Sequence, residues 1–95
     1  MNRTEHLLTI LAEECAEVSQ RVSKALRFGL DEVYRDNGAD NARMISYEMA
    51  DLMGAYQVLK NEGLLPAVDE NEFAQKQLKI ERFLDRSRRQ GTLSE

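Results

Sequence analysis

Two short segments of the chain concentrate carboxylates at helical spacing. Glu14 and Glu17 lie in "LAEECAEV", and Glu48 and Asp51 lie in "EMAD". Residues three apart lie roughly 60° from each other around an α-helix, so each pair shares one helical face. If the two pairs converge, their oxygens form a hard-ligand site suited to Mg²⁺, with Mn²⁺ as the alternative.

The surroundings of these carboxylates make simple solvation a costly explanation. On a helical wheel, Glu14 falls at the edge of an apolar stripe. Glu14, Glu48 and Asp51 have no Lys or Arg three or four positions away, whereas Glu17 has Arg21. Unpaired carboxylates at the edge of a core must be protonated, paired across helices or bound to metal. On spacing alone, a solvated acidic face remains the ordinary alternative.

Three helices are predicted to position these residues. The first spans roughly Arg3–Phe28, where apolar residues recur every three, four and seven positions, and Gly29 is its stop signal. The second runs from about Asn41 to Glu62. The third begins near Asp69 or Asn71, either of which can cap it.

The remaining segments predict connections rather than further elements. Gly29–Asp40 is expected to be a loop with a turn at Asn37-Gly38, and segment 85–95 is expected to be a frayed tail. The fold class is therefore all-α: an antiparallel helical hairpin plus a third helix, in a single domain 1–95. A chain of 95 residues has a small core, so a partner subunit or a bound metal is expected to add stability.

Composition limits the possible partners. The formal net charge is -4, and an acidic chain is not expected to bind nucleic acid. The single cysteine, Cys15, cannot form an internal disulfide, which favours a reducing compartment. Neither a secretory leader nor a membrane-length apolar run is seen, so we expect a cytoplasmic domain without membrane contact.

The two acidic segments together resemble a known family pattern. "EECAE" followed by "EMAD" is similar to the E-E-x-x-E … E-x-x-D signature of the all-α nucleoside triphosphate pyrophosphohydrolases, the MazG-like superfamily. The resemblance covers about Leu7–Leu59. "SKALRFGL" looks like the small, phage-type members, which would place the protein in the host cytoplasm if it is phage-encoded. "KQLKIERFLDRSRR" resembles, more loosely, the basic helix that often follows.

The resemblance implies an activity and a set of residues for it. It implies a nucleotide substrate, hydrolysed between the α and β phosphates to a monophosphate and pyrophosphate. Metal ions neutralise phosphate charge and lower the pKa of a bound water. Glu13, whose position by itself is that of a surface glutamate, is the candidate base for that water. It further implies a homodimer or homotetramer, with a four-helix-bundle core completed by a second protomer. The implied Mg²⁺ ligands are Glu14, Glu17, Glu48 and Asp51.

Phosphates and bases need further contacts from the protein. Basic residues follow the first motif and also share one face of the third helix, where a solvated basic face is the ordinary explanation. With a triphosphate substrate, the candidate phosphate-binding residues are Lys24, Arg27, Lys79 and Arg82. A mobile third helix could close over the site. Aromatic residues available for base stacking, each equally suited to a core, are Phe28, Tyr34, Tyr47 and Tyr56.

Two alternatives remain beside this hypothesis. The chain could be an enzyme similar to phosphoribosyl-ATP pyrophosphatase, although the long segment between the motifs and "KALRFG" favour the nucleotide pyrophosphohydrolase. It could also be a non-catalytic helical interaction module whose carboxylates bind metal structurally, or not at all. Sensitivity of a reaction to added Mg²⁺ separates the enzymes from the module.

Overall fold

A computed structural model of the chain describes residues 1–33 and 38–94. Within these ranges the chain forms three helices and no strand: α1 (Arg3–Phe28), α2 (Asn41–Asn61) and α3 (Glu70–Gln90). The prediction of an all-α fold with three helices is confirmed. The predicted turn residue Asn37 and the stacking candidate Tyr34 lie outside the described residues. No described helix combines the length and the apolar character needed to cross a bilayer.

Each helix begins at a side chain that caps it. The side chains of Asn2, Asp40 and Asp69 accept hydrogen bonds from the backbone N–H three residues later, at 2.8, 2.8 and 2.9 Å. The first turn of a helix leaves its N–H groups without helical partners, and these caps satisfy one of them in each case. Asp69, rather than Asn71, is therefore the residue that starts α3.

The helix ends differ from the sequence prediction at two places. α2 ends at Asn61, one position before the predicted end. α3 continues to Gln90, so the first half of segment 85–95 is helical where a frayed tail was expected. Gly91 follows with φ 75°, a left-handed conformation that glycine adopts readily and that commonly ends helices.

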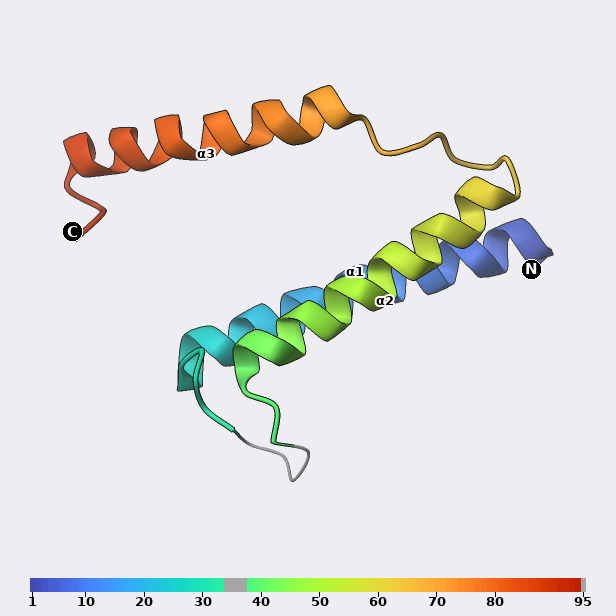
Figure 1. Ribbon diagram of the computed structural model, residues 1–95, viewed down its shortest axis with the longest axis horizontal. Coiled ribbons are helices and arrows are strands. Elements are labelled where there is room, and N and C mark those ends of the chain that lie inside the picture. Colours follow the sequence, from blue (N-terminus) through green and yellow to red (C-terminus); the bar gives the residue numbers. More distant parts are fainter. Residues whose placement is uncertain (34–37, 95) are drawn as a thin grey trace.

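α1 and α2 form an antiparallel hairpin, with the N-terminus of α1 beside the C-terminal end of α2 (Figure 1). An ion pair between Arg3 Nη2 and Glu62 Oε2, at 2.7 Å, joins the helices at that end. At the other end, the backbone N–H of Asn41 donates to Glu32 O at 3.0 Å, and its side-chain Nδ2 donates to Gly29 O at 2.8 Å. These contacts tie the start of α2 to the chain that leaves α1.

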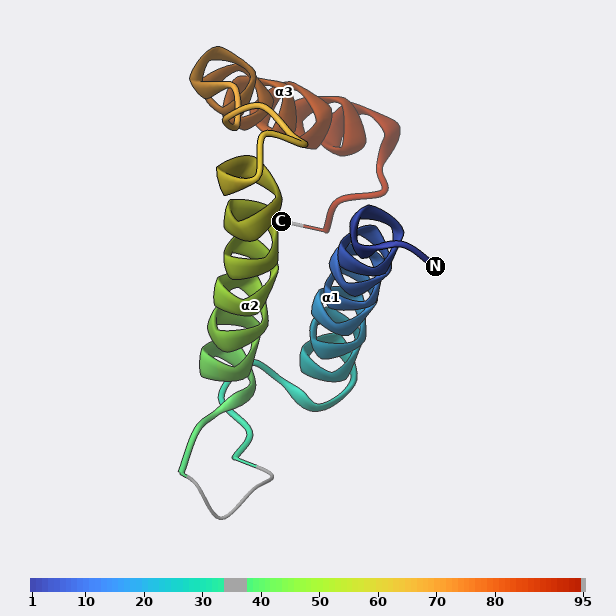
Figure 2. The ribbon, with the colours of Figure 1, turned by 90° about the vertical axis from the view of Figure 1, so that its right-hand side faces the viewer.

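The chain encloses very little core of its own. Only Ala25 and Leu59 are buried apolar residues within the described ranges, at 6 % and 0 % exposure. α3 packs against neither α1 nor α2 and is connected to the hairpin through segment 62–69 (Figure 2). Large apolar side chains on all three helices stay exposed, among them Leu8, Val22, Leu26, Met49, Met53, Phe73, Ile80 and Phe83. The apolar surface of this chain is thus largely without a partner in the single protomer.

Candidate functional site

One side of α1 carries a continuous row of chemically active side chains. Their spacings along the chain are three, four, three and four, which keeps them on one helical face. The row is acidic toward the N-terminus, basic in the middle and aromatic at its end. We call this row the α1 stripe; it consists of Glu14, Glu17, Arg21, Lys24 and Phe28.

The packing of α2 on α1 brings carboxylates together at the acidic end of the α1 stripe. Glu14, Glu17 and Glu48 each offer one oxygen, and these oxygens all lie within 4.8 Å of one another. We call these three residues the carboxylate cluster. Oxygens on opposite sides of one Mg²⁺ lie about 4 Å apart, so small side-chain movements would let all three contact a single ion.

Two oxygens of the carboxylate cluster are buried without a hydrogen-bond partner among the described residues. They are Oε2 of Glu14 and Oε2 of Glu48. A buried carboxylate oxygen that contacts neither water nor a donor is costly, because it loses hydration and gains nothing in return. A proton or a cation placed between the side chains would remove this cost.

Burial and neighbouring charge shift the protonation of the same side chains. Burial is the largest cause of the raised pKa of Glu14, and the negative charges of Glu17 and Asp51 raise it further. Burial is also the largest cause of the raised pKa of Glu48, and the neighbouring carboxyls of Glu17 and Asp51 raise it further. The positive charge of Arg21 opposes the rise in the pKa of Glu48 but does not cancel it.

Arg21 supplies a positive charge that the sequence analysis did not assign to the site. Its Nε lies 3.9 Å from Glu48 Oε1, and the two side chains are only 13 % and 14 % exposed. That separation is too long for a hydrogen bond, so the contact is an ion pair. Glu48 is therefore paired across the helices, although its Oε2 has no donor within residues 1–33 and 38–94. The signal for Arg21 was its position four residues after Glu17, on the α1 stripe.

The other two acidic candidates lie at the rim of the carboxylate cluster. Asp51 is exposed and lies outside the group within 4.8 Å, but its charge contributes to the raised pKa of both Glu14 and Glu48. Glu13 is exposed too, and its charge is the smallest contributor to the raised pKa of Glu14. The structure thus gathers three of the four predicted ligands and leaves Asp51 and Glu13 beside them.

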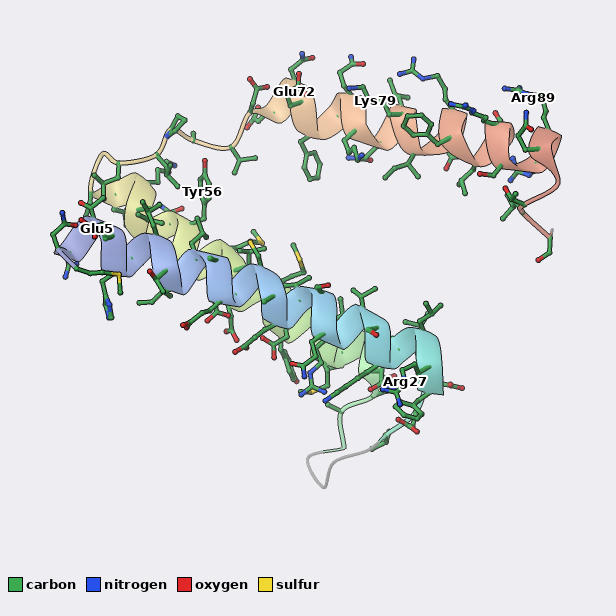
Figure 3. All side chains as sticks on the ribbon, turned by 180° about the vertical axis from the view of Figure 1, so that it is seen from behind. Glu5, Arg27, Tyr56, Glu72, Lys79 and Arg89 are labelled. Atoms are coloured by element: carbon green, nitrogen blue, oxygen red, sulfur yellow. The ribbon has the colours of Figure 1, made fainter. Side chains whose placement is uncertain are left out.

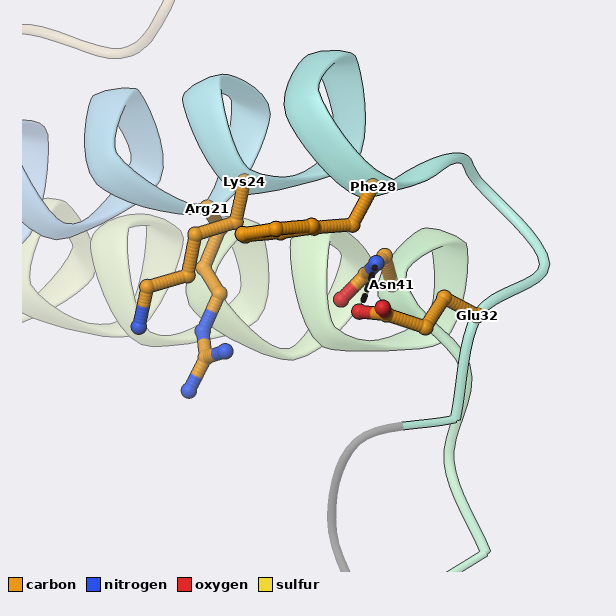
Figure 4. A pocket seen from close by; sticks show the side chains of 5 residues that line it. All are labelled: Arg21, Lys24, Phe28, Glu32 and Asn41. Atoms are coloured by element: carbon orange, nitrogen blue, oxygen red, sulfur yellow. Dashed lines mark hydrogen bonds between the residues drawn. The ribbon is translucent and has the colours of Figure 1, made fainter.

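A cavity of about 270 Å³ lies beside the basic and aromatic part of the α1 stripe (Figure 4), and Arg21, which pairs with Glu48, lines it. The residues that line it are Arg21, Lys24, Phe28, Glu32 and Asn41. The Asn41 side chain is held there by its hydrogen bond to Gly29 O and by a longer one, 3.3 Å, to Glu32 Oε1. Sequence reasoning missed Glu32 and Asn41, because a loop glutamate and a helix-start asparagine carry no chemical signal until the hairpin is folded.

The fold separates the residues that were predicted to bind phosphate into two groups. Lys24 lines the cavity, whereas the guanidinium carbon of Arg27 lies 4.8 Å from the centroid of the Phe28 ring. Lys79 and Arg82 are on α3, which packs against neither helix of the hairpin, and Figure 3 shows Lys79 set apart from it. Within one chain the structure does not bring these two side chains to the carboxylate cluster.

The aromatic candidates for base stacking are similarly divided. Phe28 lines the cavity. Tyr56 donates its hydroxyl hydrogen to Pro66 O at 2.7 Å, which fastens the segment between α2 and α3. Tyr47 is half exposed on α2 and does not line the cavity.

In a metal-free solution, the stability that these carboxyls provide is expected to fall as pH rises. A carboxyl with a raised folded-state pKa binds its proton more tightly in the folded chain, so stability is fully present below the unfolded value of 4.5 and is lost as pH rises through the folded pKa. Thermal unfolding in EDTA between pH 4 and 8 measures this. As pH rises across that window, the melting temperature of the wild type should fall relative to that of Glu48→Gln. A difference between the two proteins that stays constant would contradict the raised pKa of Glu48.

Comparison of the chain with protein-family models, with curated proteins and with solved structures finds no match. The features that bear on function are thus the carboxylate cluster, the cavity and the motif resemblance.

Proposed function

We propose that the protein is a Mg²⁺-dependent nucleotide pyrophosphohydrolase, which cleaves a (d)NTP between the α and β phosphates to a (d)NMP and pyrophosphate. The observation that carries this proposal is the pair of buried carboxylate oxygens, on Glu14 and Glu48, that have no hydrogen-bond partner among the described residues. They lie in a cluster of three carboxylates from two helices, which is a donor set that Mg²⁺ prefers. The resemblance to the MazG-like superfamily supplies the reaction.

The chain's residues fit a divalent cation at this point. Glu14, Glu17 and Glu48 would hold it, with Asp51 at the rim as the fourth candidate. When bound, Mg²⁺ would neutralise phosphate charge and lower the pKa of a coordinated water. The exposed carboxylate of Glu13 would accept the proton of the attacking water, because it lies beside the cluster without belonging to it.

Positive side chains follow the carboxylate cluster in the order that a polyphosphate needs. Arg21 and Lys24 come next along the α1 stripe and line the adjoining cavity. They would bind and orient phosphate oxygens. The hairpin would thus supply positive side chains for the phosphates without a contribution from α3. Lys79 and Arg82 would join them only through a movement of α3 or from another protomer.

The open apolar surface supports a homo-oligomer, as a homodimer or a homotetramer. A hairpin with two buried apolar residues has too small a core to be stable by itself. A second copy that covers the exposed apolar side chains would complete a four-helix-bundle core.

The non-catalytic helical module is the alternative with an observation in its favour. The ion pair between Arg21 and Glu48 gives the cluster a structural partner that requires no metal. Such a module would bind Mg²⁺ weakly or not at all and would hydrolyse nothing. The phosphoribosyl-ATP enzyme shares the proposed site chemistry and differs only in substrate.

The test is pyrophosphate release from a panel of canonical and modified NTPs and dNTPs, with phosphoribosyl-ATP included, in Mg²⁺ or in EDTA. We expect Mg²⁺-dependent formation of pyrophosphate with an equal amount of the matching monophosphate. Hydrolysis of phosphoribosyl-ATP and of no other compound in the panel would favour an enzyme similar to phosphoribosyl-ATP pyrophosphatase. If the folded protein hydrolyses none of these compounds, both enzymatic functions are contradicted and the non-catalytic helical module is favoured.

A further inference from the structure

We propose that the cavity beside the carboxylate cluster is the nucleobase subsite of this protein and that it selects guanine. The inference rests on the proposed function, because it assumes that the substrate's phosphates lie at the cluster. Its evidence is separate, however: an aromatic wall, two hydrogen-bond acceptors and the order of side chains along α1.

The Phe28 ring forms one wall of the cavity (Figure 4). Arg27 lies over this ring, 4.8 Å from its centroid, and does not itself line the cavity. A guanidinium over an aromatic face is attracted to it, so Arg27 steadies the ring from outside the cavity. The face that borders the cavity remains available for a flat base to stack on.

The amide of Asn41 has a fixed orientation. Its Nδ2 donates to the carbonyl oxygen of Gly29 at 2.8 Å, and a carbonyl can only accept, so Nδ2 and Oδ1 are not interchangeable. Asn41 is 3 % exposed, which holds the side chain in that position. Its Oδ1 is consequently directed away from Gly29, and Figure 4 shows it below the Phe28 ring, near the oxygens of Glu32.

The base-facing edge of the cavity therefore presents acceptors. Among the residues that the structure describes, the Glu32 carboxylate accepts only a long hydrogen bond from Asn41, at 3.3 Å, which leaves it able to accept from a ligand. Guanine places two donors, N1–H and the 2-amino group, side by side. Adenine and cytosine place one amino group beside a ring acceptor, and uracil places one N–H between two carbonyls. A pair of acceptors is fully satisfied by guanine and meets an unfavourable acceptor on each of the others.

The order of the α1 stripe matches the order of groups in a nucleotide. The carboxylate cluster would hold the metal-bound phosphates, Arg21 and Lys24 follow it, and Phe28 comes last. A nucleotide with its base under Phe28 would lie along this row, with its phosphates directed toward the carboxylate cluster.

The experiment compares kcat/KM for GTP, ATP, CTP and UTP in Mg²⁺ for the wild type, Glu32→Gln and the control Asp31→Asn. Asp31 is exposed in the same loop and does not line the cavity, so its variant removes the same charge outside the subsite. We expect the wild type to prefer GTP, and Glu32→Gln to lose about tenfold to a hundredfold of the GTP-over-UTP preference. Asp31→Asn should retain it.

Binding separates failure of the subsite from failure of the reaction. Calorimetry with GMP and UMP measures base selection whether or not any triphosphate is hydrolysed. Binding of GMP in preference to UMP, weakened in Glu32→Gln, would support the subsite even if hydrolysis were absent and the proposed function wrong. Equal kcat/KM for all four bases, a preference for another base, or equal binding of GMP and UMP would overturn the guanine subsite and leave the hydrolase unaffected.

Discussion

The Glu48→Gln variant should lose at least about 100-fold of the proposed Mg²⁺-dependent hydrolysis, since losing a proposed metal ligand costs no less than losing a contact that supports one. Its amide would be a neutral and weaker ligand in the carboxylate cluster. In EDTA the same variant should melt at a higher temperature than the wild type at neutral pH, because it removes a buried charge that the pKa of Glu48 shows to be unfavourable. Steady-state kinetics and thermal unfolding, each with and without Mg²⁺, measure both effects.

The matched control is Glu81→Gln, which removes the same charge from an exposed position on α3. It should retain hydrolysis, and Mg²⁺ should raise its melting temperature as much as that of the wild type. If Glu48→Gln keeps the wild-type rate, the cluster is not the metal centre. If Glu48→Gln melts higher and Mg²⁺ has no effect on either protein, the non-catalytic module is the better description.

The second large effect is expected from Met53→Lys. We expect the wild type to sediment as a dimer or larger, and the variant to dissociate at concentrations where the wild type stays associated. Met53 is 65 % exposed in the single chain and borders an apolar groove of about 470 Å³ between α1 and α2, where Leu11, Cys15 and Leu52 are also found. A lysine there would bring an unpaired charge into the interface, which weakens association by more than about 100-fold.

Val58→Lys serves as the control for this prediction. Val58 is 40 % exposed on α2, does not line the groove, and lies about 140° around the helix from Met53. The same new charge should leave the oligomer intact there. Sedimentation velocity over a range of concentrations distinguishes the outcomes, and a stably folded monomeric wild type would contradict the proposed four-helix-bundle core.

The helices themselves could be predicted closely because their signals are local. Side-chain caps and glycines lie within a few residues of the ends that they determine, and Asp40 and Asp69 are examples. The end of α3 was predicted too early, although Gly91 was the available signal. The arginines of segment 85–95 are good helix formers, and the glycine that follows them marks the end of the helix.

The placement of α3 could not be predicted from the chain. Its apolar residues Phe73, Ile80 and Leu84 lie on one side of the helix, and Lys79, Arg82 and Arg86 lie on the opposite side. This pattern shows that the helix has a face to bury but does not identify the surface that buries it. Helix packing depends on contacts between distant segments, which local spacing does not encode.

The sequence spacing identified the carboxylates of the cluster, and Lys24 and Phe28 of the cavity lining, but not Arg21, Glu32 or Asn41. Glu14, Glu17 and Glu48 could be identified because each pair of carboxylates is close in sequence, and the hairpin then brings the pairs together. Arg21 pairs with Glu48 only because α1 and α2 pack in a particular register. The cavity edge formed by Glu32 and Asn41 needs the loop to return to the start of α2, which is a tertiary feature.

The α1 stripe also gives the site a built-in gauge of ligand length. One rigid helix carries both the carboxylates and Phe28, so the separation between the metal end and the base end cannot adjust as it would between two domains. A triphosphate whose base lay under Phe28 would reach the carboxylates with its α and β phosphates, where the proposed cleavage occurs. The monophosphate product would keep its α phosphate there but lose the β and γ phosphates. Cleavage would therefore divide the ligand into two fragments, each with fewer contacts than the intact substrate, and both would leave more readily.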